Sequence, residues 1–218
     1  MPRTFILVRH AQSEHYVRGL TGGWTDTPLT ELGHRQAQRV AEWLGRELNG
    51  VPVALYASDL ARTRETADHI ARRLVLLPTF DERLREWNNG EAAGLSWEEA
   101  NTRWPQPSRW TADLRHWPGS ETWREFQSRA ASFVASLPAS EATALIVTHG
   151  GTIEALVSAW LGFTADAMED VGFRSDVTGI TVLAERGGSS PYRSLERTND
   201  TSHLEGIEGS RALLRRAD

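Results

Sequence analysis

Short apolar runs alternate along the chain with longer segments in which apolar residues recur every three or four positions. The short runs predict five strands, at Phe5–Val8, Val53–Ala57, Leu74–Leu77, Ala144–Thr148 and Ile180–Ala184. The longer segments predict helices from Thr30 to Leu48, Ser58 to Arg73, Glu121 to Leu137 and Gly151 to Leu161. Strands rich in Val, Leu and Ile that alternate with helices are typical of a sheet covered on both faces. We therefore expect an α/β fold, a three-layer α/β/α sandwich with a mostly parallel central sheet.

Residues 87–120 depart from this regular pattern. The segment contains several prolines and glycines and five tryptophans, Trp87, Trp97, Trp104, Trp110 and Trp117. Two compatible interpretations fit it: a surface excursion with a small core of its own, or a lid over the active site. No repeat or linker interrupts the rest of the chain. We expect one domain over residues 1–205 and a C-terminal tail over residues 206–218.

The composition excludes several kinds of chemistry. All 24 basic residues are arginine, and there is no cysteine. The chain therefore has no lysine for a Schiff base or a P-loop, and no thiol for nucleophilic attack, a disulfide or metal binding. Arginine binds phosphate groups bidentately, so anion recognition is open. The net charge of −5 argues against a nucleic-acid partner, and no apolar run is long enough to span a membrane. A cytoplasmic protein is expected.

Chemically capable side chains follow four of the predicted strands. In an open α/β sheet, ligands bind outside the carboxyl ends of the strands. Taken singly, each of these residues has an ordinary structural explanation. Their convergence on one edge predicts a cationic site for an anion, and the residues delivered there are Arg9, His10, Arg62, Arg85, Glu86 and His149.

Six motifs occur in order between residues 5 and 204. They are LVRHAQS (7–13), DTPLTELG (26–33), SDLARTRETA (58–67), LRE (84–86) followed by two glycines, VTHGG (147–151) and NDTSHL (199–204). Together they resemble the motifs of the histidine phosphatase superfamily, also called the phosphoglycerate mutase-like family. The resemblance implies a phosphoglycerate mutase-like fold and phosphoryl-transfer chemistry.

The resemblance implies a role for each matching residue. His10 would attack phosphorus and form a phosphohistidine. Arg9 and Arg62 would hold the phosphoryl oxygens, and His149 would donate a hydrogen bond to the transferring group. Glu86 would protonate the leaving oxygen and then accept a proton from water. Two arginines can neutralise the phosphoryl charge, so no metal and no cofactor are expected.

Further substrate contacts are expected around the phosphate. Gly22 and Gly23 lie in the segment that closes over it, and Gly150 follows the second histidine. Two departures from the family pattern lie nearby: Ala11 stands where glycine is usual, and Tyr16 where many members have an asparagine that reaches the phosphate.

Ser58 is a good residue to cap the helix that carries Arg62, and the amide-rich end of that helix would then point at the phosphate. Arg129 fits a surface ion pair and a site residue equally well. His15 is close enough to His10 in sequence to line the site. Surface positions are expected for His34, His69 and His116, and structural roles for Asn199 and His203.

Three functions are compatible with these residues. The first is a phosphatase of the histidine acid phosphatase type, acting on a small phosphomonoester without a metal. The second is a phosphoglycerate mutase; mutases of the family tend to be longer and to carry a lysine near the substrate, which this chain lacks. The third is a non-catalytic phosphate-binding scaffold on the same fold. A homodimer is compatible with all three, and the substrate is open among sugar phosphates, phosphoglycerate derivatives, nucleotides and cofactor precursors.

Overall fold

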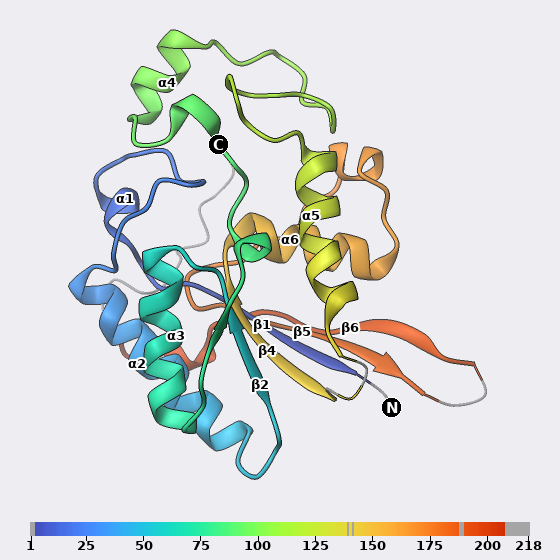
Figure 1. The fold of residues 1–218 in the computed structure, drawn as a ribbon. Helices are drawn as coiled ribbons and strands as arrows, with labels where there is room; N and C mark the ends of the chain where they lie inside the picture. The colour runs from blue at the N-terminus through green and yellow to red at the C-terminus, as the bar shows by residue number, and fades with distance from the viewer. Residues whose placement is uncertain (1–2, 139, 141, 188–189, 208–218) are drawn as a thin grey trace.

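Six strands form one sheet in the order β3-β2-β4-β1-β5-β6 (Figure 1). The structure is a computed structural model that describes residues 3–138, 140, 142–187 and 190–207. Strands β3, β2, β4 and β1 are parallel, whereas β5 runs antiparallel to β1 and β6 antiparallel to β5. The bounds are β1 Thr4–Arg9, β2 Ala54–Ala57, β3 Thr79–Phe80, β4 Thr143–Thr148, β5 Ile180–Arg186 and β6 Tyr192–Asp200. Most of the predicted tail, from residue 208 onwards, lies outside the described residues.

Helices cover both faces of this sheet, which confirms the expected three-layer α/β/α arrangement. Helices α2 and α3 pack on one face and α5 and α6 on the other (Figure 1). The bounds are α1 Glu14–Val17, α2 Glu31–Glu47, α3 Ala61–Leu74, α4 Trp97–Arg103, α5 Trp123–Ser136 and α6 Gly150–Leu161. Single 3-10 turns lie at Glu82–Leu84, Gly90–Ala92, Asp166–Glu169 and Ser202–Leu204.

The alternation of side chains along β1 divides the core into two halves. Ile6 and Val8 point toward α2 and α3, whereas Phe5 and Leu7 point toward α5 and α6. Because both faces are covered, β1 is a continuous apolar run, and each fully buried side chain contributes about 1.5–3 kcal/mol. This packing fixes the direction in which β1 delivers the residues that follow it.

The start of α2 shows how one motif folds locally. Thr30 caps the helix, its hydroxyl accepting a hydrogen bond from the amide of Gly33. A Cβ at Gly33 would collide with the carbonyl of Gln12, so glycine allows the helix to approach the loop after β1. The spacing from Thr30 to Gly33 therefore anchors that loop.

The predicted strand at Leu74–Leu77 is wrong. Helix α3 continues to Leu74 and ends at Val75, whose φ of 56° is left-handed. Val75 and Leu77 are 90% and 91% exposed, and the strand follows at β3. A short apolar run does not distinguish a helix end from a strand, and here only tertiary packing decided the outcome.

Part of the tryptophan-rich segment packs on the main core. Trp87 and Trp110 pack against Trp123, which lies in the core between α5, α6 and the sheet. Trp97 and Trp117 pair with each other, with ring centroids 6.0 Å apart. Figure 1 shows α4 and its flanking loops beyond the carboxyl ends of the parallel strands, above α1.

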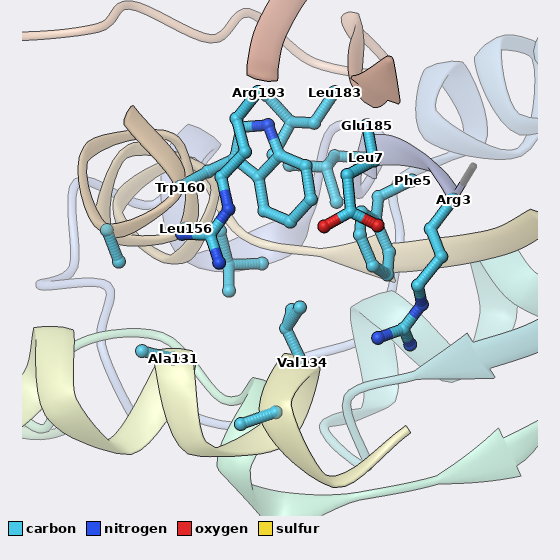
Figure 2. Close-up of a pocket in the computed structure, with 12 residues that line it drawn as sticks. Arg3, Phe5, Leu7, Ala131, Val134, Leu156, Trp160, Leu183, Glu185 and Arg193 are labelled. Atoms are coloured by element: carbon cyan, nitrogen blue, oxygen red, sulfur yellow. The ribbon is translucent and has the colours of Figure 1, made fainter. Parts of the chain in front are cut away.

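A cavity of about 270 Å³ lies between α5, α6 and the sheet (Figure 2). Phe5, Leu7, Val134 and Trp160 line it, with Arg193 stacked over the indole of Trp160. It opens beside the amino-terminal half of β1, whereas the candidate functional residues follow the carboxyl end of that strand. This cavity is therefore separate from the candidate site.

Candidate active site

His10 follows the carboxyl end of β1 and is 4% exposed. Its Nδ1 lies 2.7 Å from the carbonyl oxygen of Ala11. A carbonyl oxygen can only accept a hydrogen bond, so Nδ1 carries the proton and the lone pair of the ring is on Nε2. The Nε of Arg62 donates to that Nε2 at 3.2 Å. Burial, with Arg62 and Arg9 adding to it, lowers the pKa of His10 well below its ordinary value. His10 is therefore neutral near pH 7 and presents Nε2 to the site.

Arg62 reaches His10 from the first turn of α3 and is 1% exposed. Its two terminal nitrogens donate to the carbonyls of Thr25 at 2.8 Å and Gly23 at 2.7 Å. Burial lowers the pKa of Arg62 to about 10, so the guanidinium is still charged at neutral pH. These two bonds aim the remaining Nε at His10.

Arg9, the last residue of β1, lies beside the first turn of α6. One terminal nitrogen donates to the carbonyl of Ser175 at 2.5 Å, and Nε is buried without a hydrogen-bond partner among the described residues. Burial lowers the pKa of Arg9 from its ordinary value. A Cβ at Gly150 would lie 3.4 Å from the guanidinium carbon, so this predicted site glycine is in van der Waals range of Arg9.

His149 follows β4 and is fully buried, with its ring centroid 5.2 Å from that of His10. Its Nε2 lies 2.9 Å from the hydroxyl of Ser58, while Nδ1 has no partner among the described residues. Burial, reinforced by Arg62, lowers the pKa of His149 well below its ordinary value. A buried polar atom without a partner is unusual, and it marks a place where a ligand can bind.

Glu86 completes the group of predicted residues that the fold brings together. Its Oε1 accepts from the amide of Trp87 at 2.9 Å, and its Oε2 from the amide of Gly151 at 3.0 Å, at the start of α6. A Cβ at Gly151 would collide with Oε1. Gly151, which the sequence alone did not single out as a site residue, is thus needed for the carboxylate to sit where it does.

Four side chains donate hydrogen bonds to the carbonyls just before Glu86 and at Glu86 itself. Arg129 bonds the carbonyls of residues 83, 85 and 86 at 2.8–3.0 Å and forms an ion pair with Glu121 at 2.7 Å. The other donors are Thr148, Thr152 and the indole of Trp24. Arg129 is therefore a part-buried residue that forms an ion pair and fixes the backbone that carries Glu86.

The loop over residues 21–25 is held in place by Asn89, a buried residue that no sequence motif marks as functional. Its amide oxygen accepts from Trp24 N at 2.9 Å, and its amide nitrogen donates to Thr21 Oγ1 and to Gly22 O. Gly23 has φ of 56°, and a Cβ there would collide with the Asn89 side chain. Glycine is thus required where this loop carries the carbonyl that orients Arg62.

Ser58 does not cap the helix as expected. Helix α3 begins at Ala61 with Leu60 as the capping residue, and the Ser58 hydroxyl contacts His149 instead. Arg85, predicted at the same edge, makes a bidentate ion pair with Asp59 at 2.6 and 2.7 Å. Its guanidinium is thereby engaged away from His10.

The two departures from the family pattern have different outcomes. Ala11 is fully buried, and its amide donates to Thr66 Oγ1 at 3.1 Å, so the added methyl group is accommodated. Tyr16 is 61% exposed, and its side chain is not buried in the site. His15 is buried 6.2 Å from His10, ring centroid to ring centroid, and burial lowers its pKa to about 4.

The remaining histidines and Asn199 lie elsewhere, with one exception. His34 and His69 are half-buried, 3.2 Å apart between α2 and α3. The buried His203 lies 2.9 Å from Thr178 Oγ1, and Asn199 bonds Asp176, so both act structurally as expected. His116 is the exception, because it lines a cavity that reaches Glu86.

That cavity has a volume of about 580 Å³ and lies between the loop over residues 21–25 and the tryptophan-rich segment. Glu86, Gly22, Gly23 and Gly151 form the side that borders the site. In the described part of the chain, no three His, Asp or Glu residues are grouped to hold a metal ion. Nor does any described helix have the length and apolar character needed to cross a membrane.

Comparison with known proteins gives the same family from sequence and from structure. The model of the histidine phosphatase superfamily (branch 1) matches residues 5–201. A Methylobacterium radiotolerans 2,3-bisphosphoglycerate-dependent phosphoglycerate mutase is 35% identical over 81% of this chain and 88% of its own. A Hydrogenobacter thermophilus protein, named provisionally as phosphoserine phosphatase 2, is 32% identical over 93% of this chain and 99% of its own.

Among solved structures, a mycobacterial glucosyl-3-phosphoglycerate phosphatase superposes with a TM-score of 0.78. It is 28% identical and covers 92% of this chain and all of its own. The named relatives thus include both phosphatases and mutases.

Proposed function

Because the chain belongs to the histidine phosphatase superfamily, we propose that it is a phosphatase that hydrolyses a small phosphomonoester through a phosphohistidine on His10. The observation that carries the proposal is the state of the His10 ring. The Ala11 carbonyl holds the proton on Nδ1, and Arg62 faces the lone pair of Nε2. A neutral imidazole that keeps its proton on one nitrogen and its lone pair on the other can attack phosphorus as a nucleophile.

In the first step, Nε2 of His10 forms a bond to phosphorus while the bond from phosphorus to the leaving oxygen breaks. Glu86 gives its proton to that oxygen, and the alcohol departs. In the second step, water attacks phosphorus and the bond to Nε2 breaks. The proton of the water passes to Glu86, so inorganic phosphate leaves and the starting state returns.

Arg9, Arg62 and His149 stabilise the charge on the phosphoryl oxygens during both steps. Arg62 Nε faces the attacking nitrogen, and Arg9 Nε and His149 Nδ1 are buried without a hydrogen-bond partner among the described residues. Charge-assisted hydrogen bonds from preorganised donors are worth most in a site closed to water. Two guanidinium groups neutralise a phosphoryl dianion, so the mechanism proceeds without a metal.

Ser58 determines which nitrogen of His149 can donate. If its hydroxyl donates to Nε2, the proton of the ring is on Nδ1, the atom without a partner. Gly22, Gly23 and Gly150 would let the backbone approach the phosphate closely, because they have no side chains.

Trapping of the phosphoenzyme tests this proposal. The protein is mixed with para-nitrophenyl phosphate labelled at phosphorus, in excess chelator, and denatured without acid because phosphohistidine is acid-labile. We expect labelled protein and released phosphate from the wild type, and neither from His10→Ala. His69→Ala, which removes a histidine remote from the site, should behave as wild type. Label that persists in His10→Ala, or activity lost on chelation, would contradict the proposal.

The same assay separates a mutase from a phosphatase. A mutase would interconvert 2- and 3-phosphoglycerate faster than it releases inorganic phosphate, and a scaffold would bind phosphate without acquiring label. We expect phosphate release to exceed interconversion.

A further inference from the structure

The cavity beside Glu86, here called the side cavity, borders the site where a leaving group must lie. Glu86 has to reach the leaving oxygen to protonate it, so the group attached to that oxygen extends on the Glu86 side of the phosphate. Glu86, Gly22, Gly23 and Gly151 are shared by the site and the side cavity. At about 580 Å³ the side cavity is in the size range of a small-molecule pocket.

Aromatic and amide side chains line much of the side cavity. The rings are those of Trp87, Trp97, Trp117 and His116, and the Trp97 and Trp117 rings meet at 56° with centroids 6.0 Å apart. The amide side chains are Asn88, Asn89, Asn101 and Gln106. Flat aromatic faces stack on planar or ring-shaped ligands, and amides bond to hydroxyl and carbonyl groups.

The side cavity has no cation for an anionic leaving group. None of the described residues that line it is an arginine, and the chain has no lysine. Its one histidine among the described lining residues, His116, has its Nδ1 2.5 Å from Gln106 Oε1, and burial lowers the pKa of His116. The one acidic side chain on the described lining is Glu86, the proposed proton donor. A second anion would be desolvated there without a cationic partner.

We propose that the side cavity selects an uncharged, ring-bearing alcohol as the leaving group, of the sugar or nucleoside type, and disfavours leaving groups that carry a carboxylate or a second phosphate. This inference rests on the proposed phosphatase function. It differs from the substrates in the names of the three relatives reported above, because phosphoserine, phosphoglycerate and glucosyl-3-phosphoglycerate all carry a carboxylate.

A matched pair of esters tests the role of charge. Glycerol 3-phosphate and 3-phosphoglycerate differ in a hydroxymethyl group against a carboxylate at the far end of the leaving group. We expect kcat/KM to be about tenfold or more higher for glycerol 3-phosphate. A kcat/KM for 3-phosphoglycerate or phosphoserine equal to or above that for glycerol 3-phosphate would overturn the inference.

A second comparison tests the role of the ring. If the ring is bound, kcat/KM should be higher for glucose 6-phosphate and for adenosine 5′-monophosphate than for glycerol 3-phosphate. The ratio of kcat/KM between the two ring-bearing esters distinguishes a sugar site from a nucleoside site. In Trp97→Ala/Trp117→Ala, the advantage of the better ring substrate over glycerol 3-phosphate should shrink about tenfold or more. Trp104→Ala, a half-buried tryptophan of the same segment outside the lining, should keep the wild-type ratio. An unchanged ratio in the double variant would remove the stacking argument.

A variant that is expected to gain activity avoids the ambiguity of a variant that loses activity because it does not fold. Asn101 is exposed on α4 and lines the side cavity, so Asn101→Arg adds a cation without disturbing the core. This variant should raise kcat/KM for 3-phosphoglycerate relative to glycerol 3-phosphate, and no change in that ratio would count against the charge argument. Hydrolysis of para-nitrophenyl phosphate reports separately on the chemical step. If this ester is hydrolysed but 3-phosphoglycerate is preferred to glycerol 3-phosphate, only this inference fails. If neither it nor any other ester is hydrolysed, the proposed function fails and the inference with it.

Discussion

The Nε of Arg62 donates a hydrogen bond of 3.2 Å to the Nε2 of His10, the nitrogen proposed to attack phosphorus. The other two nitrogens of the same guanidinium are tied to the carbonyls of Gly23 and Thr25. One planar group thus joins the loop over residues 21–25 to the nucleophile. The rigid fork of arginine permits this arrangement, and a lysine ammonium cannot reproduce it.

Arg62→Lys should therefore lower kcat by about 10²–10³-fold, the loss typical of removing one donor to a developing charge. The carbonyls of Gly23 and Thr25 would also lose their partners, which should cost about 1–3 kcal/mol in the free energy of unfolding. Steady-state kinetics and urea unfolding measure the two effects. Arg72→Lys, at an exposed position of α3, is the control. A kcat loss below tenfold would show that Arg62 does not contact the reacting group.

Ser58→Ala should weaken catalysis about tenfold by leaving His149 Nε2 unpaired. A structural effect alone would not change the protonation of the ring. Nitrogen NMR of His149 in the free protein tests this, because the wild type should carry its proton on Nδ1 and the variant should shift toward Nε2. Ser132→Ala, at an exposed position of α5, should change neither property.

Glu86→Gln removes the proton donor while keeping the shape of the side chain. For esters with poor leaving groups kcat should fall about 10²–10⁴-fold, whereas para-nitrophenyl phosphate, whose leaving group needs little protonation, should lose much less. The slope of log kcat against leaving-group pKa measures the difference. The exposed Glu91→Gln should leave this slope as in the wild type. Equal losses for good and poor leaving groups would exclude Glu86 as the acid.

Gly151→Ala should displace the Glu86 carboxylate, because the added Cβ would collide with its Oε1. Alanine favours helix over glycine by up to about 1 kcal/mol, so we expect kcat to fall about tenfold without a matching loss of stability. Gly150→Ala, one residue earlier, meets Arg9 at an ordinary contact distance of 3.4 Å and should lose less activity. Steady-state kinetics and thermal unfolding of both variants measure the two effects. A larger loss of kcat in Gly150→Ala than in Gly151→Ala would contradict the assigned position of Glu86.

The buried His203 should make stability fall in acid. Burial lowers its pKa to about 4, against about 6.5 in an unfolded chain. Between these values the unfolded chain binds a proton that the folded chain does not, so stability is lost as pH falls from 6.5 to 4, by up to about 3 kcal/mol. Urea unfolding at several pH values should show that the free energy of unfolding falls less steeply between pH 6.5 and 4 in His203→Gln than in the wild type. His34→Gln, at a half-buried surface position, is the control, and identical slopes in all three would refute the linkage.

Much of the fold could be predicted because the relevant signals are local. The apolar runs at β1 and β4 and the periodic segments at α2 and α6 have the lengths and spacings of buried strands and helices. The strand predicted at Leu74–Leu77 was wrong because solvent exposure decides between a helix end and a strand. Four residues of sequence do not determine that exposure. The capping role predicted for Ser58 was wrong for a related reason. Its hydroxyl could cap a helix or contact a side chain, and it contacts His149, which is 91 positions away in the sequence.

The sequence by itself determined which chemical groups follow each strand, and hence that two histidines, two arginines and a carboxylate meet at one edge of the sheet. Strand direction and parallel pairing are sufficient for that conclusion. Only the tertiary structure decided how those groups are used. The proton on His10 Nδ1, the diversion of Arg85 to Asp59 and the absence of cations from the described lining of the side cavity depend on side-chain directions. Those directions are fixed when distant elements pack together, and no local pattern encodes them.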